Sequence, residues 1–143
     1  MSKPTPNAKK TVLIVDDEEN IRLIVSRLMQ TAGHRTLTAE TGQQAIDLLR
    51  AGTRLDLVIL DVRMPELDGF QTLVQIRNDL ALTELPVIML TGQKSDEDLL
   101  AGYGVGADYY LTKPPKLDRL LNIVAYLIGD LTAEQRAKLE QSL

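Results

Sequence analysis

Five polar residues that follow short apolar stretches could together carry out phosphate chemistry. Asp16 and Asp17 come directly after one apolar run, Asp61 ends a second, Thr91 follows a third and Lys113 lies just beyond the last. Three carboxylates held at one place raise one another's pKa, and a hard divalent cation with oxygen ligands relieves that repulsion. An ammonium group adds a charge suited to a phosphate oxygen or a carboxylate. These residue types indicate a Mg²⁺ site, with Mn²⁺ as the alternative ion, in which a carboxylate attacks phosphorus.

The elements that must position these residues are five runs rich in Val, Ile and Leu. The first, third and fourth runs are nearly continuous, as strands covered on both faces are. The other two are more mixed and suit places nearer the edges of a sheet. The expected strands are residues 11–15, 35–39, 55–60, 86–90 and 108–111.

Apolar residues at helical spacing fill the stretches between these strands. Gly33 follows the first such stretch, where a helix would end, and Thr41 with Gln44 resembles a capping box that opens the second. Ser95 would cap the fourth helix. The apolar stripe of the first helix is Ile21, Ile24, Val25, Leu28 and Met29, and the later helices are expected to run through Leu49 and over 70–80, 95–103 and 117–128.

This fivefold alternation of strand and helix predicts a doubly wound α/β fold. Right-handed crossovers would build a parallel sheet with helices on both faces. Such sheets carry their active groups outside the carboxyl ends of the strands, so Asp16, Asp17, Asp61, Thr91 and Lys113 are expected to converge. Residue type and placement alone leave open which of the three aspartates is the nucleophile.

The chain of 143 residues has room for one domain of ordinary size. Residues 1–10 are expected to be a disordered lead-in, 11–129 the folded domain and 130–143 an extra amphipathic helix that Thr132 caps. The apolar stripe of this last helix is thin. Three roles for it stay open: packing on the domain, pairing with a second copy in a homodimer, or leading into an output domain.

The composition narrows the range of functions. Cysteine is absent, which excludes disulfides and thiolate chemistry, and the net charge of −4 disfavours nucleic-acid binding. No apolar run approaches the roughly 20 residues of a membrane span. We therefore expect a cytoplasmic protein that binds neither nucleic acid nor a membrane.

Four motifs resemble the receiver domains of bacterial response regulators in two-component signalling. They are VLIVDD at 12–17, DVRMPELDG at 61–69, Thr91 followed by Gly92, and Lys113 followed by Pro114. Together they cover about residues 11–128 in the family's order. The resemblance implies a flavodoxin-like sheet in the order 2-1-3-4-5.

The resemblance also implies a role for each site residue. Asp61 would be the phosphoacceptor, and the metal would be held by Asp16, Asp17, Asp61 and the backbone carbonyl of Arg63. Lys113 would bind a phosphoryl oxygen. The remaining implied roles are the switch hydroxyl of Thr91, the switch aromatic of Tyr110 and the tuning of hydrolysis by Arg63 and Gln93.

The expected function is signalling, and not catalysis on other substrates. A histidine kinase or phosphotransfer protein would donate the phosphoryl group, and an output protein or attached output domain would read the changed surface. A phosphohydrolase with the same chemistry is the first alternative, but Arg63 stands where that class has its second aspartate. A phosphate-independent interaction module is the other, although such domains lose site residues that this chain keeps.

Overall fold

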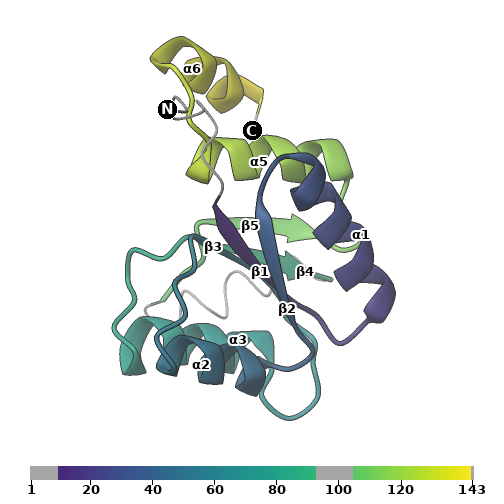
Figure 1. Cartoon of the computed structure of the whole chain (residues 1–143), viewed down its shortest axis with the longest axis vertical. Coiled ribbons are helices and arrows are strands. Elements are labelled where there is room, and N and C mark those ends of the chain that lie inside the picture. Colours follow the sequence, from purple (N-terminus) through teal and green to yellow (C-terminus); the bar gives the residue numbers. More distant parts are fainter. Residues whose placement is uncertain (1–9, 93–104, 143) are drawn as a thin grey trace, which may run out of the picture.

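A parallel sheet of five strands forms the centre of the molecule (Figure 1). The computed structural model describes residues 10–92 and 105–142. The strand order β2-β1-β3-β4-β5 confirms the predicted topology. Strand bounds differ from the expected ones by one to two residues at most. The strands are β1 (Thr11–Val15), β2 (Arg35–Ala39), β3 (Leu57–Asp61), β4 (Val87–Thr91) and β5 (Tyr109–Thr112).

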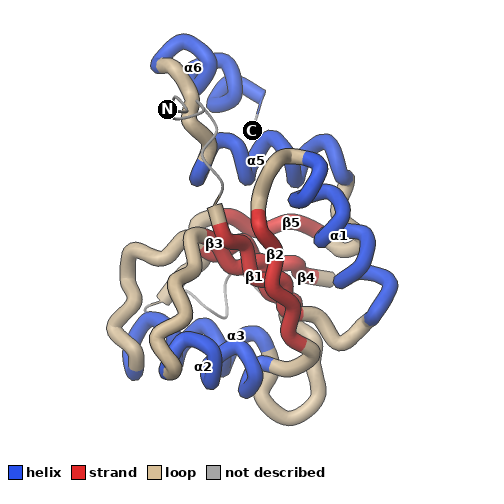
Figure 2. Tube along the Cα trace, in the orientation of Figure 1, coloured by secondary structure: helices blue, strands red, loops and turns tan. Residues whose placement is uncertain are grey.

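Helices cover both faces of the sheet, as Figure 2 shows. The helices α1 (Glu19–Thr31) and α5 (Leu117–Ile128) pack on one face, and α2 (Gly42–Arg50) and α3 (Gly69–Val74) on the other. In β3, Ile59 belongs to the first apolar cluster and Leu60 to the second, and both are fully buried. Side chains alternate across a strand, so a strand buried on both faces has to be apolar at every position.

Side-chain caps fix where the helices of the second face begin. Thr41 accepts a hydrogen bond from the Gln44 amide, as predicted, while the Gln44 side chain accepts one from the Glu40 amide. Asp68 and Gln71 form a full capping box at the start of α3. These bonds satisfy amides that lack partners within the helix. The Asp68–Gly69 pair therefore shapes a turn and a helix start.

The third helix differs from the continuous helix expected over 70–80. It is α-helical only to Val74 and continues as a π-helical turn over Gln75–Asp79. Within that turn Arg77 donates to the carbonyls of Leu82 and Leu85 and pairs with Asp108 at 3.2 Å. These partners lie in later segments of the chain. The wider turn therefore accompanies contacts that a local sequence pattern does not contain. The fourth helix expected over 95–103 lies outside the described residues.

One position of the predicted stripe on α1 is wrong. Ile24 is 46% exposed, whereas Val25 and Met29 are fully buried. The spacing placed the correct face of the helix toward the sheet, but the contact with α5 and β1 is narrower than the stripe. Among the described residues no helix is long and apolar enough to cross a membrane.

The extra helix α6 (Ala133–Ser142) lies against the outer side of α5 (Figure 1). Thr132 caps it as predicted, because its hydroxyl accepts from the Gln135 amide. None of its described residues is buried. The contact with α5 is polar: Tyr126 donates to Glu140, and the Arg136 guanidinium lies 4.4 Å from the centre of the Tyr126 ring. Such exposed polar contacts hold a helix only weakly.

We expect Gly69→Ala to destabilise the fold at the point where it supports Asp61. A Cβ at residue 69 would overlap the carbonyl oxygen of Asp61 and lie 2.7 Å from the Cα of Val62. Backbone atoms cannot move aside cheaply, so the free energy of unfolding should fall by about 1–3 kcal/mol. Urea unfolding followed by circular dichroism measures it. Gly106→Ala is the control, since among residues 10–92 and 105–142 its Cβ would meet only the Tyr110 hydroxyl, at 3.7 Å. Equal stability of the two variants would contradict this packing.

Candidate functional site

The carboxyl ends of the strands bring the predicted residues to one edge of the sheet. Asp16 follows β1, Asp61 ends β3 opposite Leu90, and Thr91 ends β4 opposite Thr112. Lys113 follows β5 directly, and its amide donates to the Thr91 carbonyl at 2.8 Å. Parallel register therefore produces the predicted convergence of residues that are almost a hundred positions apart.

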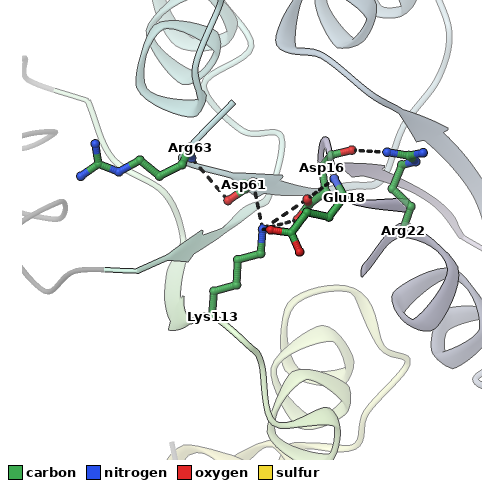
Figure 3. Close-up of polar contacts among 6 residues, drawn as sticks. All are labelled: Asp16, Glu18, Arg22, Asp61, Arg63 and Lys113. Carbon is green, nitrogen blue, oxygen red and sulfur yellow. Dashed lines mark hydrogen bonds and ion pairs between the residues drawn. The ribbon is translucent and has the colours of Figure 1, made fainter. Parts of the chain in front are cut away.

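The ammonium group of Lys113 connects these strand ends (Figure 3). Its Nζ lies 3.0 Å from Asp61 Oδ2, 3.0 Å from Asp16 Oδ2 and 3.2 Å from Glu18 Oε1. The side chains of Asp16 and Asp61 are 0% and 2% exposed, whereas that of Glu18 is 60% exposed. One cation thus faces two buried carboxylates and a third at the rim.

The acidic residues after β1 suit a divalent cation. Carboxylate oxygens of Asp16, Asp17 and Glu18 lie within 4.8 Å of one another. Asp16 Oδ1 accepts from the Glu18 amide at 2.9 Å, so this residue also fixes the turn into α1. Asp16 Oδ2 is buried and has an ionic contact with Lys113 but no hydrogen bond to any described residue. An oxygen-only donor set with one unsatisfied buried oxygen fits Mg²⁺.

Burial dominates the electrostatics of the aspartates. It raises the pKa of Asp61 to about 6, with the Asp16 charge adding to the effect and Lys113 opposing it. Burial also raises the pKa of Asp16, against hydrogen bonds from Glu18 and Lys113. For Lys113, burial lowers the pKa, but bonds to Asp16 and Asp61 outweigh it and the net shift is upward. The lysine therefore stays charged, while the raised pKa values of Asp16 and Asp61 favour their protonated forms.

Thr91, Tyr110 and Arg63 are the other predicted site residues that the structure describes. Thr91 is buried at the end of β4. Tyr110 is partly buried against the core, and its hydroxyl accepts from the Ala107 amide. The Arg63 amide is 3.4 Å from Asp61 Oδ1, while its side chain is exposed and extends away from the carboxylate (Figure 3). Gln93 lies outside the described residues.

Sequence reasoning missed two residues that hold the site together. Glu18 pairs with Lys113, which is 95 positions away. Arg22 donates to the Asp16 carbonyl at 2.7 Å and lies 3.6 Å from Glu40 after β2. Arg22 falls on the first turn of α1 beside the acidic pair, and that placement is the only local signal for its role.

We expect the metal-free protein to lose stability as the pH rises from about 4 to about 6. Because the pKa of Asp61 is raised to about 6, the folded state holds this proton more tightly than the unfolded state does. This proton contributes its full stabilisation below the pKa of the unfolded state, and the stabilisation is lost as Asp61 ionises. The free energy of unfolding should fall by about 1–3 kcal/mol. Urea unfolding at several pH values measures it.

Asp61→Asn is the control for this titration, because an amide has no proton to lose in that range. The variant should lack the part of the decline that Asp61 causes and keep the part that follows from the raised pKa of Asp16, and a ¹³C-labelled Asp61 carboxyl in the wild type should titrate near pH 6. A wild-type carboxyl that titrates near 4 would contradict the burial argument.

Comparisons with known proteins identify the family. Residues 12–125 match the family model described as the response regulator receiver domain. Response regulator MprA of Mycolicibacterium vanbaalenii is 36% identical over 88% of this chain and 53% of its own length. The chain spans about half the length of the curated relatives it matches.

Solved structures agree with this match. Chemotaxis protein CheY4 of Vibrio cholerae has a TM-score of 0.74 at 35% identity, over 84% of this chain and 99% of that one. Response regulator TrrA of Thermotoga maritima, solved in complex with Mg²⁺ and beryllium fluoride, has a TM-score of 0.72 at 34% identity, over 82% and 98%. With the motif set, the sheet order and the acidic edge in agreement, the chain belongs to the response regulator receiver domains, the phosphoacceptor domains of two-component signalling.

Proposed function

We propose that Asp61 is the residue on which this receiver domain accepts its phosphoryl group. The geometry of its two oxygens carries the proposal. Oδ2 is 3.0 Å from Lys113 Nζ, and from the described part of the chain Oδ1 receives only a long contact of 3.4 Å, from the Arg63 amide. Asp16 is equally buried and also keeps one oxygen, Oδ2, without a hydrogen bond to a described residue, but its Oδ1 is committed to the turn into α1 at 2.9 Å, so Asp16 suits the role of a fixed metal ligand. Asp61 thus retains an oxygen that is free to attack.

The proposed reaction is a displacement at phosphorus. An Asp61 oxygen forms a bond to the phosphorus of a donor phosphohistidine while the phosphorus–nitrogen bond breaks. The product is an aspartyl phosphate, and the imidazole leaves as a neutral ring after protonation by solvent. Lys113 balances charge on a phosphoryl oxygen, so catalysis rests on positioning and electrostatics. The domain would assist its own phosphorylation and dephosphorylation and act on no other substrate.

The residues that would hold Mg²⁺, or Mn²⁺, are Asp16, Asp17, Asp61 and the backbone carbonyl of Arg63. The cation would neutralise negative charge on the transferring phosphoryl group. The acidic cluster after β1 and the unsatisfied Oδ2 of Asp16 support this assignment. The Mg²⁺–beryllium fluoride complex of the similar protein TrrA supports it as well.

We further propose that Thr91 and Tyr110 carry the signal away from Asp61. The Thr91 hydroxyl would bond the phosphoryl group, and Tyr110 would leave its bond with the Ala107 amide and turn inward. Phosphorylation adds about −1.5 to −2 charge, enough to bias such a two-state element. A histidine kinase or phosphotransfer protein would supply the group in the cytoplasm, and an output domain or partner protein would read the change.

Asp61→Asn should abolish phosphorylation of the protein. With acetyl phosphate and Mg²⁺, intact mass spectrometry of the wild type should show one phosphoryl adduct, and chelation of the metal should remove it. The variant should show less than about 1% of this labelling, since loss of a nucleophile costs several kcal/mol of activation free energy. Asp47→Asn, an exposed carboxylate on α2, is the matched control and should label normally. A labelled Asp61→Asn protein would exclude Asp61 as the acceptor.

We expect Arg63 and Gln93 to tune hydrolysis of the aspartyl phosphate. Each lies two positions beyond a site residue. The Arg63 side chain points away from Asp61 in the resting structure, so it would turn toward the aspartyl phosphate to orient the attacking water. The double variant Arg63→Ala/Gln93→Ala should slow the decay about three- to tenfold, which is ~1 kcal/mol. Release of inorganic phosphate from purified phosphoprotein gives the rate. Gln43→Ala/Arg50→Ala on α2 removes the same side-chain types and should leave the decay unchanged; equal rates in both double variants would refute the role.

A further inference from the structure

Lys113 has more carboxylate partners than the phosphoryl chemistry needs. An ammonium group has three N–H donors, and here it donates to Asp16, Asp61 and Glu18. A phosphoryl oxygen that binds Lys113 must therefore displace one of these partners. The three bonds differ in how easily they can be given up.

Glu18 is the partner that can leave at least cost. Its side chain is 60% exposed and can regain water when it releases the lysine, whereas Asp16 and Asp61 are buried. Exposed ion pairs contribute little net stability, because water and salt screen them. The carboxylate of Glu18 lies beside the ammonium group of Lys113 (Figure 3) and is the most exposed of its three partners.

The backbone around Glu18 holds its carboxylate over the lysine. The Glu18 amide donates to Asp16 Oδ1 at 2.9 Å, and Arg22 donates to the Asp16 carbonyl at 2.7 Å. These two bonds fix the turn between β1 and α1 from both sides. Glu18 therefore stands at a set position, and its contact with Lys113 follows from the turn.

We propose that Glu18 is a positioning residue that occupies Lys113 in the resting domain and thereby slows phosphorylation of Asp61. This inference rests on the proposed function of Asp61. An incoming phosphoryl group meets Glu18 as a competitor for the same N–H donor of Lys113. Once the group is attached, Glu18 moves into solvent and Lys113 turns to the phosphoryl oxygen.

The test compares Glu18→Gln with Glu19→Gln in the full chain at saturating Mg²⁺. Both changes remove one negative charge from adjacent exposed residues, but of these two described residues only Glu18 pairs with Lys113. The initial rate of adduct formation is measured over a range of acetyl phosphate concentrations. Glu18→Gln should raise the maximal rate about two- to fivefold, the scale of an exposed ion pair, and Glu19→Gln should leave it unchanged.

Two further measurements separate this role from a structural or metal-binding one. In a Lys113→Ala background the Glu18→Gln change should have no effect on rate, because the competitor acts through the lysine. The Mg²⁺ concentration that gives half the maximal rate should change no more for Glu18→Gln than for Glu19→Gln. A metal-ligand role predicts the opposite, a marked loss of Mg²⁺ affinity without a faster maximal rate.

Several results would overturn the proposal. An equal or slower maximal rate in Glu18→Gln, the same acceleration in Glu19→Gln, or an acceleration that persists without Lys113 would each do so. Failure of the proposed function looks different, because the wild type would then take no label or Asp61→Asn would keep it. In that case the inference about Glu18 falls with the function.

Discussion

The ion pairing of Lys113 with two buried aspartates is the interaction on which the site depends. Asp16 and Asp61 lie at the ends of adjacent strands, and each is almost fully removed from water. Burial of two like charges is costly, and the lysine offsets only part of that cost, since the pKa of Asp61 still rises to about 6. The resting site is thus short of positive charge. A divalent cation and a phosphoryl group suit such a site, because the cation supplies charge and the lysine can then bind phosphate.

The parallel arrangement of the strands brings Lys113 and the two aspartates together. Parallel strands end on the same edge, and the register places Asp61 next to the end of β4 and Lys113 next to Thr91. Behind Asp61 the chain turns back closely: the Gly69 amide donates to the Val62 carbonyl at 2.8 Å. Only a residue without a Cβ allows this approach. Asp61 is therefore held by the backbone packed behind it as well as by its own hydrogen bonds.

The opposite side of the site is held by charges on α1 and after β2. Arg22 joins the Asp16 carbonyl to Glu40, so the edge strand, the turn and the helix meet at one guanidinium. Glu18 extends the same turn toward Lys113. By contrast, α6 contacts α5 through the Tyr126–Glu140 hydrogen bond and the Arg136–Tyr126 ring contact, and it shares none of the site's residues. The described site residues therefore all belong to the receiver fold, and α6 contributes none of them.

The sequence alone determined the strands, the fold class and the convergence of the aspartates with Thr91 and Lys113. Fully buried strands need continuous apolar runs, caps such as Thr41 are local, and parallel topology then dictates which ends meet. The choice of Asp61 as acceptor came from the family motif, because three aspartates at one edge are equivalent by type and spacing.

Tertiary structure decided which charges actually touch. The contact of Glu18 with Lys113 spans 95 positions. The π-helical turn holds Arg77, which bonds to later segments of the chain. Ile24 is exposed because α1 packs against the sheet through a narrow face. No local pattern carries these facts, since each depends on a neighbour that only folding brings near. The sequence thus predicts the aspartates and the lysine of the site. Which carboxylate would release Lys113 first depends on how deeply each is buried.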